Sequence, residues 1–426
     1  MFHTIKKGWN TPEIRNRILF TFLMIIVFRI GSAIPVPFMN AEAIKSIMNS
    51  EAGSMLGFVD LLSGGSLAKM SVFALSIYPY ITASIIIQLL TVAIPSLGEL
   101  ARDGEHGQRK INQYTKYGAI FLGLFEGYAL INRFLAGAVI ADNILQKITI
   151  LVTVIAGSMF LVWLGDMITE KGIGNGISII VFLGIISQIP DQIVSWIFKV
   201  KDGQYSYLLV AILVAITILV VFIVVAINEG ERRIPVQYAK RVVGRKMYGG
   251  QSTHIPVKVN MASVMPVIFS GAIMNLPRML GILFGREIPQ WYIRYFTPEG
   301  NIGIWIFTLI QLGLVIMFAF FYTAIQFNTV EYAKNLQQYG GFIPGIRPGR
   351  PTGEFLQKIS NRVTFIGALA LALIVTIPIV VGKFVPHVNL AFSGTAVIIV
   401  AGVIIETVKQ IESLMMMKQY KGFLNK

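Results

Sequence analysis

The chain has no cysteine and few charged residues, and both deficits narrow what it can be. Without cysteine it forms no disulfide, no thiolate metal site and no cysteine nucleophile. Asp, Glu, Lys and Arg make up only 13% of its 426 residues, whereas soluble domains carry about 25%. So few charges cannot cover a water-facing surface, which excludes an ordinary soluble protein.

Motifs for nucleotide and metal chemistry are also missing. The sequence contains no GxxxxGK[ST] phosphate-binding loop and no HExxH pair. The four histidines, His3, His106, His254 and His387, are scattered along the chain. The nearest glycine-rich run is GIGNG at 172–176, which we interpret as the flexible start of a membrane helix because no strand precedes it. We expect no enzyme, no cofactor and no metal.

What the chain has in abundance is hydrophobic length. Hydrophobic residues make up 55% of the sequence, and its mean hydropathy is +0.69. A helix needs about 20 apolar residues to cross a hydrocarbon core about 30 Å thick. Ten such windows occur, and their continuous apolar character favours helices over a barrel. The predicted spans are 18–37, 72–94, 117–135, 147–167, 176–197, 207–228, 262–284, 302–326, 363–381 and 391–411.

The distribution of Lys and Arg predicts the orientation of these spans. With the N-terminus in the cytoplasm, cytoplasmic segments carry 25 of the 36 Lys and Arg residues, the opposite side carries 10, and Arg29 lies within a span. The positive-inside rule therefore places both ends in the cytoplasm. Two basic cytoplasmic loops, 229–260 and 328–362, are the expected contact surfaces for phosphate, anionic lipid or acidic protein. The positive-inside rule alone is the alternative explanation of their charge.

Prolines interrupt two of the predicted spans. Pro79 lies in the second span, and Pro266 and Pro277 lie in the seventh. Interrupted spans often line a cavity or gate, and a simple kink is the alternative. Between the first two spans, the short apolar run in MLGFVDLLSGGSLAKM cannot cross a bilayer. It either lies on the membrane surface or re-enters a cavity.

A few ionisable residues fall within the spans. Most lie near a helix end, where the charge can reach the interface, which favours structural or partner-binding roles over ion coupling. They are Arg29, Glu126, Asp166 and Glu406.

Several long motifs, taken in order, resemble one family. They are FRIGSAIPVP, SGGSLAKMSVFALSIYPYITASIIIQLL, GEHGQRKINQYTKYG, WLGDMITEKGIGNGISII, ERRIPVQYAKR, QSTHIPVKVNMASVMPVIF, FYTAIQFN and GFIPGIRPG. With them the chain resembles the SecY family, the channel subunits of bacterial protein translocases. The resemblance implies an all-α integral membrane protein with ten transmembrane helices in two pseudo-symmetric halves of five, a clamshell with a short plug helix. The implied parts are a cytoplasmic segment 1–17, halves 18–197 and 198–411, and a cytoplasmic tail 412–426.

The resemblance also implies a function. The family passes unfolded secretory polypeptides across the plasma membrane and releases membrane segments into lipid through a lateral gate. It implies SecE and SecG as partner subunits, with SecA or the ribosome, which would be contacted through ribosomal RNA phosphate, as the driving partner. Two other classes remain alternatives. A secondary transporter predicts an ionisable site at the membrane midplane, and an intramembrane enzyme predicts paired catalytic groups.

Residue by residue, the resemblance assigns four groups of site residues. The pore ring falls on Ile77, Ile81, Ile177, Val181, Ile268 and Ile399, and aliphatic packing is the alternative for each. The plug covers about 55–66, with Met55, Leu56, Phe58, Val59, Leu61, Leu62, Ser63, Gly64 and Gly65. Polar lateral-gate positions are Ser84, Gln88 and Asn260. Docking positions for SecA or the ribosome are Lys240, Arg241, Arg245, Lys246, Arg347 and Tyr420.

Overall fold

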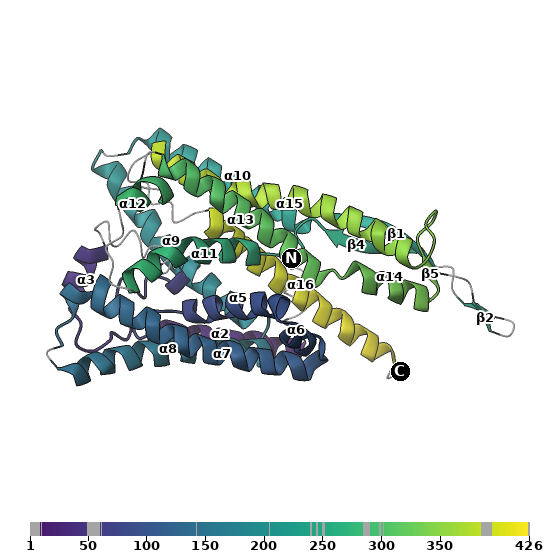
Figure 1. Ribbon diagram of the computed structural model, residues 1–426, viewed down its shortest axis with the longest axis horizontal. Coiled ribbons are helices and arrows are strands. Elements are labelled where there is room, and N and C mark those ends of the chain that lie inside the picture. The colour runs from purple at the N-terminus through teal and green to yellow at the C-terminus, as the bar shows by residue number, and fades with distance from the viewer. Residues whose placement is uncertain are drawn as a thin grey trace. The chain divides into compact units, whose positions relative to one another are not determined.

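The chain folds into two compact units, drawn in Figure 1. Unit 1 comprises Met1–Ala211, Ala272–Pro289 and Val403–Lys426, and unit 2 comprises Ile212–Gly271 and Gln290–Gly402. The computed structural model describes residues 9, 11–48, 60, 62–141, 143–203, 205–238, 241–243, 246–248, 252–283, 290–297, 300, 302–384 and 394–424. Helices dominate both units, as the sequence predicts.

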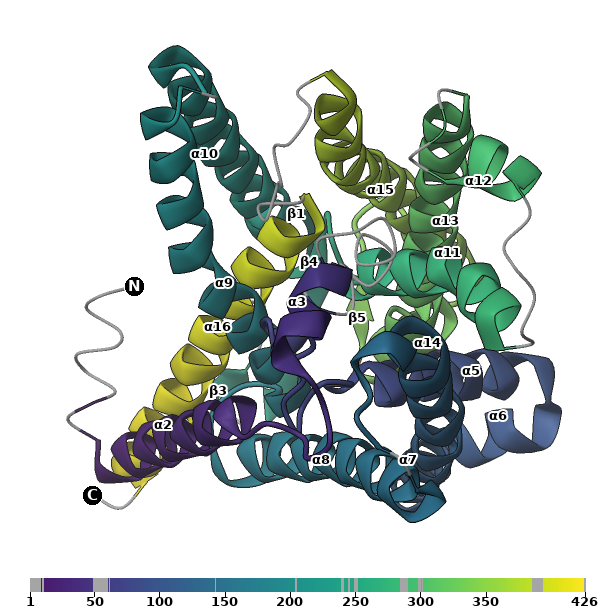
Figure 2. The ribbon, with the colours of Figure 1, turned by 90° about the vertical axis from the view of Figure 1, so that its left-hand side faces the viewer.

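Unit 1 is a set of packed helices. Within it α7 packs against α5 and α8, and α8 also packs against α2 and α9. Figures 1 and 2 show α7 and α8 side by side. The elements are α2 (Pro12–Ala33), α3 (Ala41–Met48), α5 (Tyr78–Ala93), α6 (Pro95–Arg102), α7 (Gly104–Ala129), the π-helix η1 (Leu130–Phe134), the 3-10 helix η2 (Ala136–Ala138), α8 (Ile144–Lys171) and α9 (Gly176–Lys201). The end of α16 (Gly394–Leu424) also belongs to unit 1.

The buried core of unit 1 includes the loop that precedes α5. Leu67, Met70 and Leu75 of this loop are buried with Ile44 of α3 and Ile150 of α8. The backbone of the loop is also anchored, since Val36 donates to the carbonyl of Met70 at 2.9 Å and Val72 donates to that of Ile34 at 2.9 Å. The segment between the first two predicted spans is therefore an integral part of the unit.

Two of the prolines that interrupt predicted spans begin helices instead. α5 begins at Tyr78, with Pro79 in its first turn, where the missing N–H of proline costs no hydrogen bond. The preceding residues 72–77 form turns, so the second span begins later than the predicted residue 72. In the seventh span, Pro266 likewise occupies the first turn of α11 (Met265–Leu283), and Pro277 lies inside that helix. The interpretation of Pro79 and Pro266 as breaks within helices is corrected to helix starts.

Unit 2 combines long helices with a small antiparallel sheet of order β4-β1-β5. Ile234 of β1 pairs with Ile255 of β4. Ile234 and Val236 of β1 are buried against α14 and α15, where Leu336 and Leu356 complete the cluster. The elements are α10 (Tyr207–Glu229), β1 (Glu231–Tyr238), β2 (Arg241–Val243), β3 (Lys246–Tyr248), β4 (Ser252–Lys258), α12 (Gln290–Phe296), α13 (Gly303–Gln326), α14 (Thr329–Gln338), β5 (Gly341–Phe342) and α15 (Arg350–Phe384).

Every predicted span coincides with a helix in the described part of the chain. Seven of these helices are long and apolar enough to cross a membrane, or eight if the bent pair α5 and α6 counts as one span. That pair turns by 109° before Pro95, so α6 leaves the direction of α5. The exposed side chains of α10 include Ile218, Leu219 and Phe222, which suits a helix surrounded by lipid. The protein is an all-α, multi-pass membrane protein.

Candidate functional site

In unit 1, four of the predicted pore-ring residues lie at the starts of two helices. Ile77 immediately precedes α5 and Ile81 lies one turn further on, so the two share a face. Ile177 and Val181 have the same spacing in the first turns of α9. Ile77, Ile81 and Val181 are buried and Ile177 is partly buried.

In unit 2, the two remaining ring residues are also at helix starts. Ile268 lies in the first turn of α11, and Ile399 lies near the start of α16. Both side chains are buried. The assignment of all six residues to one pore constriction stays a prediction.

The GIGNG loop before α9 is held in place, contrary to the prediction of a flexible helix start. Arg17 donates from Nη1 to the carbonyl of Gly172 at 3.1 Å. The Thr21 hydroxyl accepts from the N–H of Ile173 at 3.1 Å. Gln410 of α16 accepts from the N–H of Gly174. Side chains of α2 and α16 therefore fix the point at which α9, with Ile177 and Val181, begins.

The described end of the predicted plug is buried inside unit 1. Leu62 and Ser63 are buried, followed by Gly64 and Gly65 with left-handed φ values of 68° and 77°. Glycine adopts this conformation without strain, which explains the end of the short helix here. At this described end the chain is enclosed by protein, which favours the second alternative for the run, entry into a cavity. Met55, Leu56, Phe58, Val59 and Leu61 lie outside the described residues.

Asp60 begins the described part of this segment, and its carboxylate folds back onto the chain. Oδ1 accepts from the N–H of Ala68 at 2.9 Å. Burial raises the pKa of Asp60, while the hydrogen bonds from Ala68, Ser63 and Leu67 and the charge of Lys69 oppose the rise. The carboxylate therefore stabilises a closed loop of the chain from 60 to 68.

The three predicted gate residues make hydrogen bonds within their own units. On α5, Gln88 donates from Nε2 to the Ser84 hydroxyl at 3.4 Å. In unit 2, Asn260 donates from Nδ2 to Oδ1 of Asn228 at 2.9 Å and to the carbonyl of Ser263 at 2.9 Å. Asn228 and Asn260 are both buried. The asparagine pair thus joins α10 to the start of α11, and a role in a lateral gate stays a prediction.

Two charged residues inside predicted spans have different surroundings. Asp166 of α8 forms a 2.6 Å ion pair with Lys116 of α7, which supports the structural role predicted for it. Glu126 of α7 is buried, and neither of its carboxylate oxygens has a hydrogen-bond partner among the residues that the structure describes. Within the described residues, no group of His, Asp and Glu is arranged to hold a metal ion.

The predicted docking residues lie in the basic loops and the tail. β2 and β3 form a hairpin in which Arg241 pairs with Tyr248 and Val243 pairs with Lys246. Lys240 and Arg245 lie outside the described residues. Arg347 is exposed, and its carbonyl accepts from the Thr352 hydroxyl at 2.9 Å, which fixes the tip of the loop against the start of α15. Tyr420 lies in the last turns of α16.

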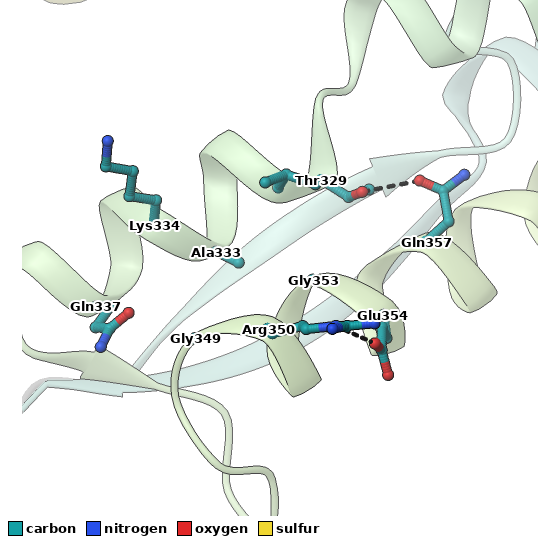
Figure 3. A pocket seen from close by; sticks show the side chains of 10 residues that line it. Thr329, Ala333, Lys334, Gln337, Gly349, Arg350, Gly353, Glu354 and Gln357 are labelled. Atoms are coloured by element: carbon teal, nitrogen blue, oxygen red, sulfur yellow. Dashed lines mark hydrogen bonds and ion pairs between the residues drawn. The ribbon is translucent and has the colours of Figure 1, made fainter.

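A groove next to this tip was not predicted from the sequence. It has a volume of about 490 Å³ and lies between α14 and the first turns of α15 (Figure 3). Thr329 donates to Gln357 at 2.8 Å across its floor, and Arg350 pairs with Glu354 at 2.9 Å along one side. Lys334 adds a second basic side chain to its lining. The basic residues of 328–362 indicated a contact surface in this part of the sequence. The groove itself could not be predicted, because it forms only where α14 packs on α15.

Solved structures share this fold. The structure described as "The structure of a protein conducting channel" aligns with a TM-score of 0.69 at 18% identity, covering 94% of this chain and 92% of that chain. "Sec61 in the Canine ribosome-channel complex from the endoplasmic reticulum" aligns with a TM-score of 0.63 at 16% identity, with the same coverage. The helices and these likenesses define a multi-pass membrane protein with the fold of protein-conducting channels.

Sequence comparison identifies the family. The SecY family model matches residues 71–408. Protein translocase subunit SecY of Thermus thermophilus is 41% identical over 434 residues, covering 99% of this chain and 98% of that protein. Its counterpart from Escherichia coli K12 is 40% identical over 430 residues, covering 100% of this chain and 96% of that protein. The chain belongs to the SecY family.

Proposed function

We propose that the protein is a protein-conducting channel that passes unfolded secretory polypeptides across the bacterial plasma membrane. Its similarity to translocase subunits over nearly the whole chain is the observation that carries this proposal. Six aliphatic side chains, Ile77, Ile81, Ile177, Val181, Ile268 and Ile399, form the constriction. An apolar constriction excludes ions by dewetting and offers a passing chain no fixed hydrogen-bond partner.

The plug and the lateral gate complete the channel. The segment 55–66 closes the pore at rest, and its described end is buried accordingly. Ser84, Gln88 and Asn260 hold a lateral gate through which membrane segments pass into lipid. The two halves, 18–197 and 198–411, are pseudo-symmetric, which is supported by the matching helix starts at Pro79 and Pro266.

Partners supply the direction of transport. The sequence has no phosphate-binding loop, so an external motor is needed. SecA or the ribosome docks on the cytoplasmic loops through Lys240, Arg241, Arg245, Lys246 and Arg347, and SecA also contacts Tyr420. SecE and SecG complete the channel complex. Both chain ends lie in the cytoplasm, in keeping with the 25 Lys and Arg residues assigned to that side.

Photocrosslinking tests the proposed path. A photoreactive residue replaces Ile268 in the full-length chain, in proteoliposomes with SecA and a stalled presecretory protein. We expect an adduct to the presecretory protein that depends on ATP. The matched control places the same residue at Ile218, which is 65% exposed on α10, and we expect lipid adducts only. Translocation without an adduct at Ile268 contradicts the assigned path.

A solute-transport assay tests the principal alternative. The buried Glu126 is the intramembrane ionisable group that a secondary transporter would use. We expect no uptake of small solutes driven by an ion gradient in the absence of a presecretory protein. Gradient-driven uptake that is lost in Glu126→Gln contradicts the channel proposal.

A further inference from the structure

Three polar side chains of the helical scaffold donate hydrogen bonds to backbone carbonyls of the predicted plug. Gln188 of α9 donates from Nε2 to the carbonyl of Asp60 at 2.8 Å. Ser187, its neighbour on α9, donates to the carbonyl of Gly64 at 3.2 Å. Ser76, just before α5, donates to the carbonyl of Leu62 at 3.2 Å. Every second carbonyl from 60 to 64 therefore bonds to the scaffold.

The backbone of this segment lies directly against α9. A methyl group added to Gly184 would come within 2.5 Å of the Leu62 carbonyl oxygen, and one added to Gly64 would come within 2.8 Å of the Gly184 Cα. Both neighbours are backbone atoms, which cannot rotate away. Two glycines thus allow the plug to approach α9 closely enough for Ser187 and Gln188 to reach its carbonyls.

The segment also carries its own internal hydrogen bonds, which do not depend on the scaffold. The Asp60 carbonyl accepts from the Ser63 hydroxyl at 3.0 Å and from the N–H of Gly65 at 3.1 Å. The Asp60 carboxylate accepts from Ala68 at 2.9 Å. Release of residues 60–64 breaks the three scaffold bonds, while the bonds within 60–65 can persist because both of their partners lie in the segment. The three scaffold bonds are therefore the ones that hold 60–64 against α9 and the start of α5, while Leu67 and Met70 stay anchored in the core.

The three donors contribute unequally. The single hydroxyl proton of Ser187 is shared with the carbonyl of Gly184, which is nearer at 2.7 Å, so this hydroxyl retains a partner after the plug leaves. Ser76 is buried, and among the described residues its hydroxyl bonds to the carbonyl of Leu62 alone. The bonds from Ser76 and Gln188 are therefore the ones that seat the plug most strongly.

We propose that Ser76, Ser187 and Gln188 form a latch that holds the plug in its seat and sets how readily the resting channel opens. This inference rests on the proposed function, since it assigns the positioning residues of the same channel. The three side chains of the latch bond to backbone carbonyls, so the latch does not depend on which side chains the plug carries. Gly184 is part of it because any larger residue holds the plug away from the donors.

The test measures plug release directly. The chain has no cysteine, so Leu62→Cys gives a single thiol at a fully buried position. In proteoliposomes of the full-length chain, its labelling by a membrane-impermeant thiol reagent reports release of the plug. We expect Gln188→Leu and Ser76→Ala each to accelerate labelling about fivefold, the effect of losing one hydrogen bond, and Gly184→Ala to do at least as much.

Resting ion conductance of the same variants without the cysteine gives a second measurement. Gly313→Ala is the matched control, because a methyl group added there meets no atom within 4 Å, and we expect unchanged labelling and conductance. Equal labelling and conductance in Gln188→Leu, Ser76→Ala and wild type overturn the latch, while ATP-driven translocation by wild type leaves the proposed function intact. Failure of wild type to translocate presecretory protein with SecA overturns the proposed function and the latch with it.

Discussion

Ser76 and Ser263 have the same unusual backbone conformation at equivalent positions of the two units. Their φ values are 51° and 54°, and each lies three residues before the proline in the first turn of the next helix, Pro79 of α5 or Pro266 of α11. Left-handed backbone is unfavourable for serine, so its occurrence twice at one offset is evidence of a shared local design. The two helix starts thus correspond, as a pseudo-symmetric chain requires.

The strain at Ser263 predicts a stabilising substitution. Ser263→Gly retains the carbonyl that accepts from Asn260 and removes the Cβ that disfavours positive φ. We expect the free energy of unfolding to rise by about 1 kcal/mol, measured by thermal unfolding in detergent. Ser263→Ala is the control, because it retains the strain and should give no gain. A stability for Ser263→Gly no higher than that of Ser263→Ala contradicts the argument.

The buried pair Asn228 and Asn260 predicts a measurable coupling. Their 2.9 Å hydrogen bond joins α10 to the start of α11. A double-mutant cycle with Asn228→Ala and Asn260→Ala should give a coupling energy of about 0.6 kcal/mol and at most about 1.7 kcal/mol. Thr217→Ala, on the same helix α10, should be additive with Asn260→Ala, because Thr217 bonds only to Leu213 among the described residues. Additivity of the asparagine pair contradicts the coupling.

The pore ring predicts an ion seal. Replacing Ile81 and Ile268 with glycine would remove apolar bulk from the proposed constriction, so we expect the resting channel to conduct ions. The measurement is conductance in planar bilayers. Glycine also weakens helices by about 1 kcal/mol per residue, and the double control Ile218→Gly with Leu309→Gly places the same change at exposed positions. A tight seal in the ring variant shows that the plug alone closes the pore.

The proposed docking role of Arg347 predicts that reversing its charge weakens the interaction with SecA. Its exposed side chain lies at a loop tip that the bond from Thr352 holds in place. Arg347→Glu should slow SecA-dependent translocation about tenfold, equivalent to about 1.4 kcal/mol, while expression is unchanged. Lys358→Glu makes the same charge reversal on the exposed face of α15 and should have a smaller effect. Equal rates for Arg347→Glu and wild type argue against the docking role.

Asp60 predicts that acid strengthens plug seating. Burial raises its pKa above the ordinary 3.8 in the seated state, against the opposing charge of Lys69. Because the pKa of Asp60 is higher in the seated state, protonation of Asp60 favours the seated plug. This stabilisation is fully present below pH 3.8, the ordinary pKa, and is lost as the pH rises through the higher pKa of the seated state. Resting conductance should therefore fall on acidification toward 3.8. Asp60→Asn cannot titrate and should abolish this pH dependence. If Asp60→Asn and wild type have the same pH profile of conductance, the pH dependence arises from another group.

The sequence predicted the membrane helices well because each is a run of about 20 apolar residues that needs no distant information. It located helix starts less well. Pro79 has the same appearance whether it kinks a helix or begins one, and burial of Ile77 and Leu75 in the preceding turns decides between the two.

The contacts that matter most for the site join distant parts of the chain. Gln188 meets Asp60 across 128 positions, and Arg17 meets Gly172 across 155. No periodicity reveals such pairs. The polar residues Ser187 and Gln188 within the apolar fifth span were the available signal, and the loop GIGNG was interpreted as flexible because its partners on α2 and α16 are far away in sequence.

α15 is one helix of 35 residues, from Arg350 beside the exposed loop tip at Arg347 to Phe384, and it contains Pro378. At about 1.5 Å per residue it is about 52 Å long, whereas the hydrocarbon core is about 30 Å thick. The helix is therefore longer than a bilayer-crossing segment needs to be. If the proposed motor docks at Arg347, its force would reach the buried stretch around Leu371 and Val375 along one helix, without an intervening loop.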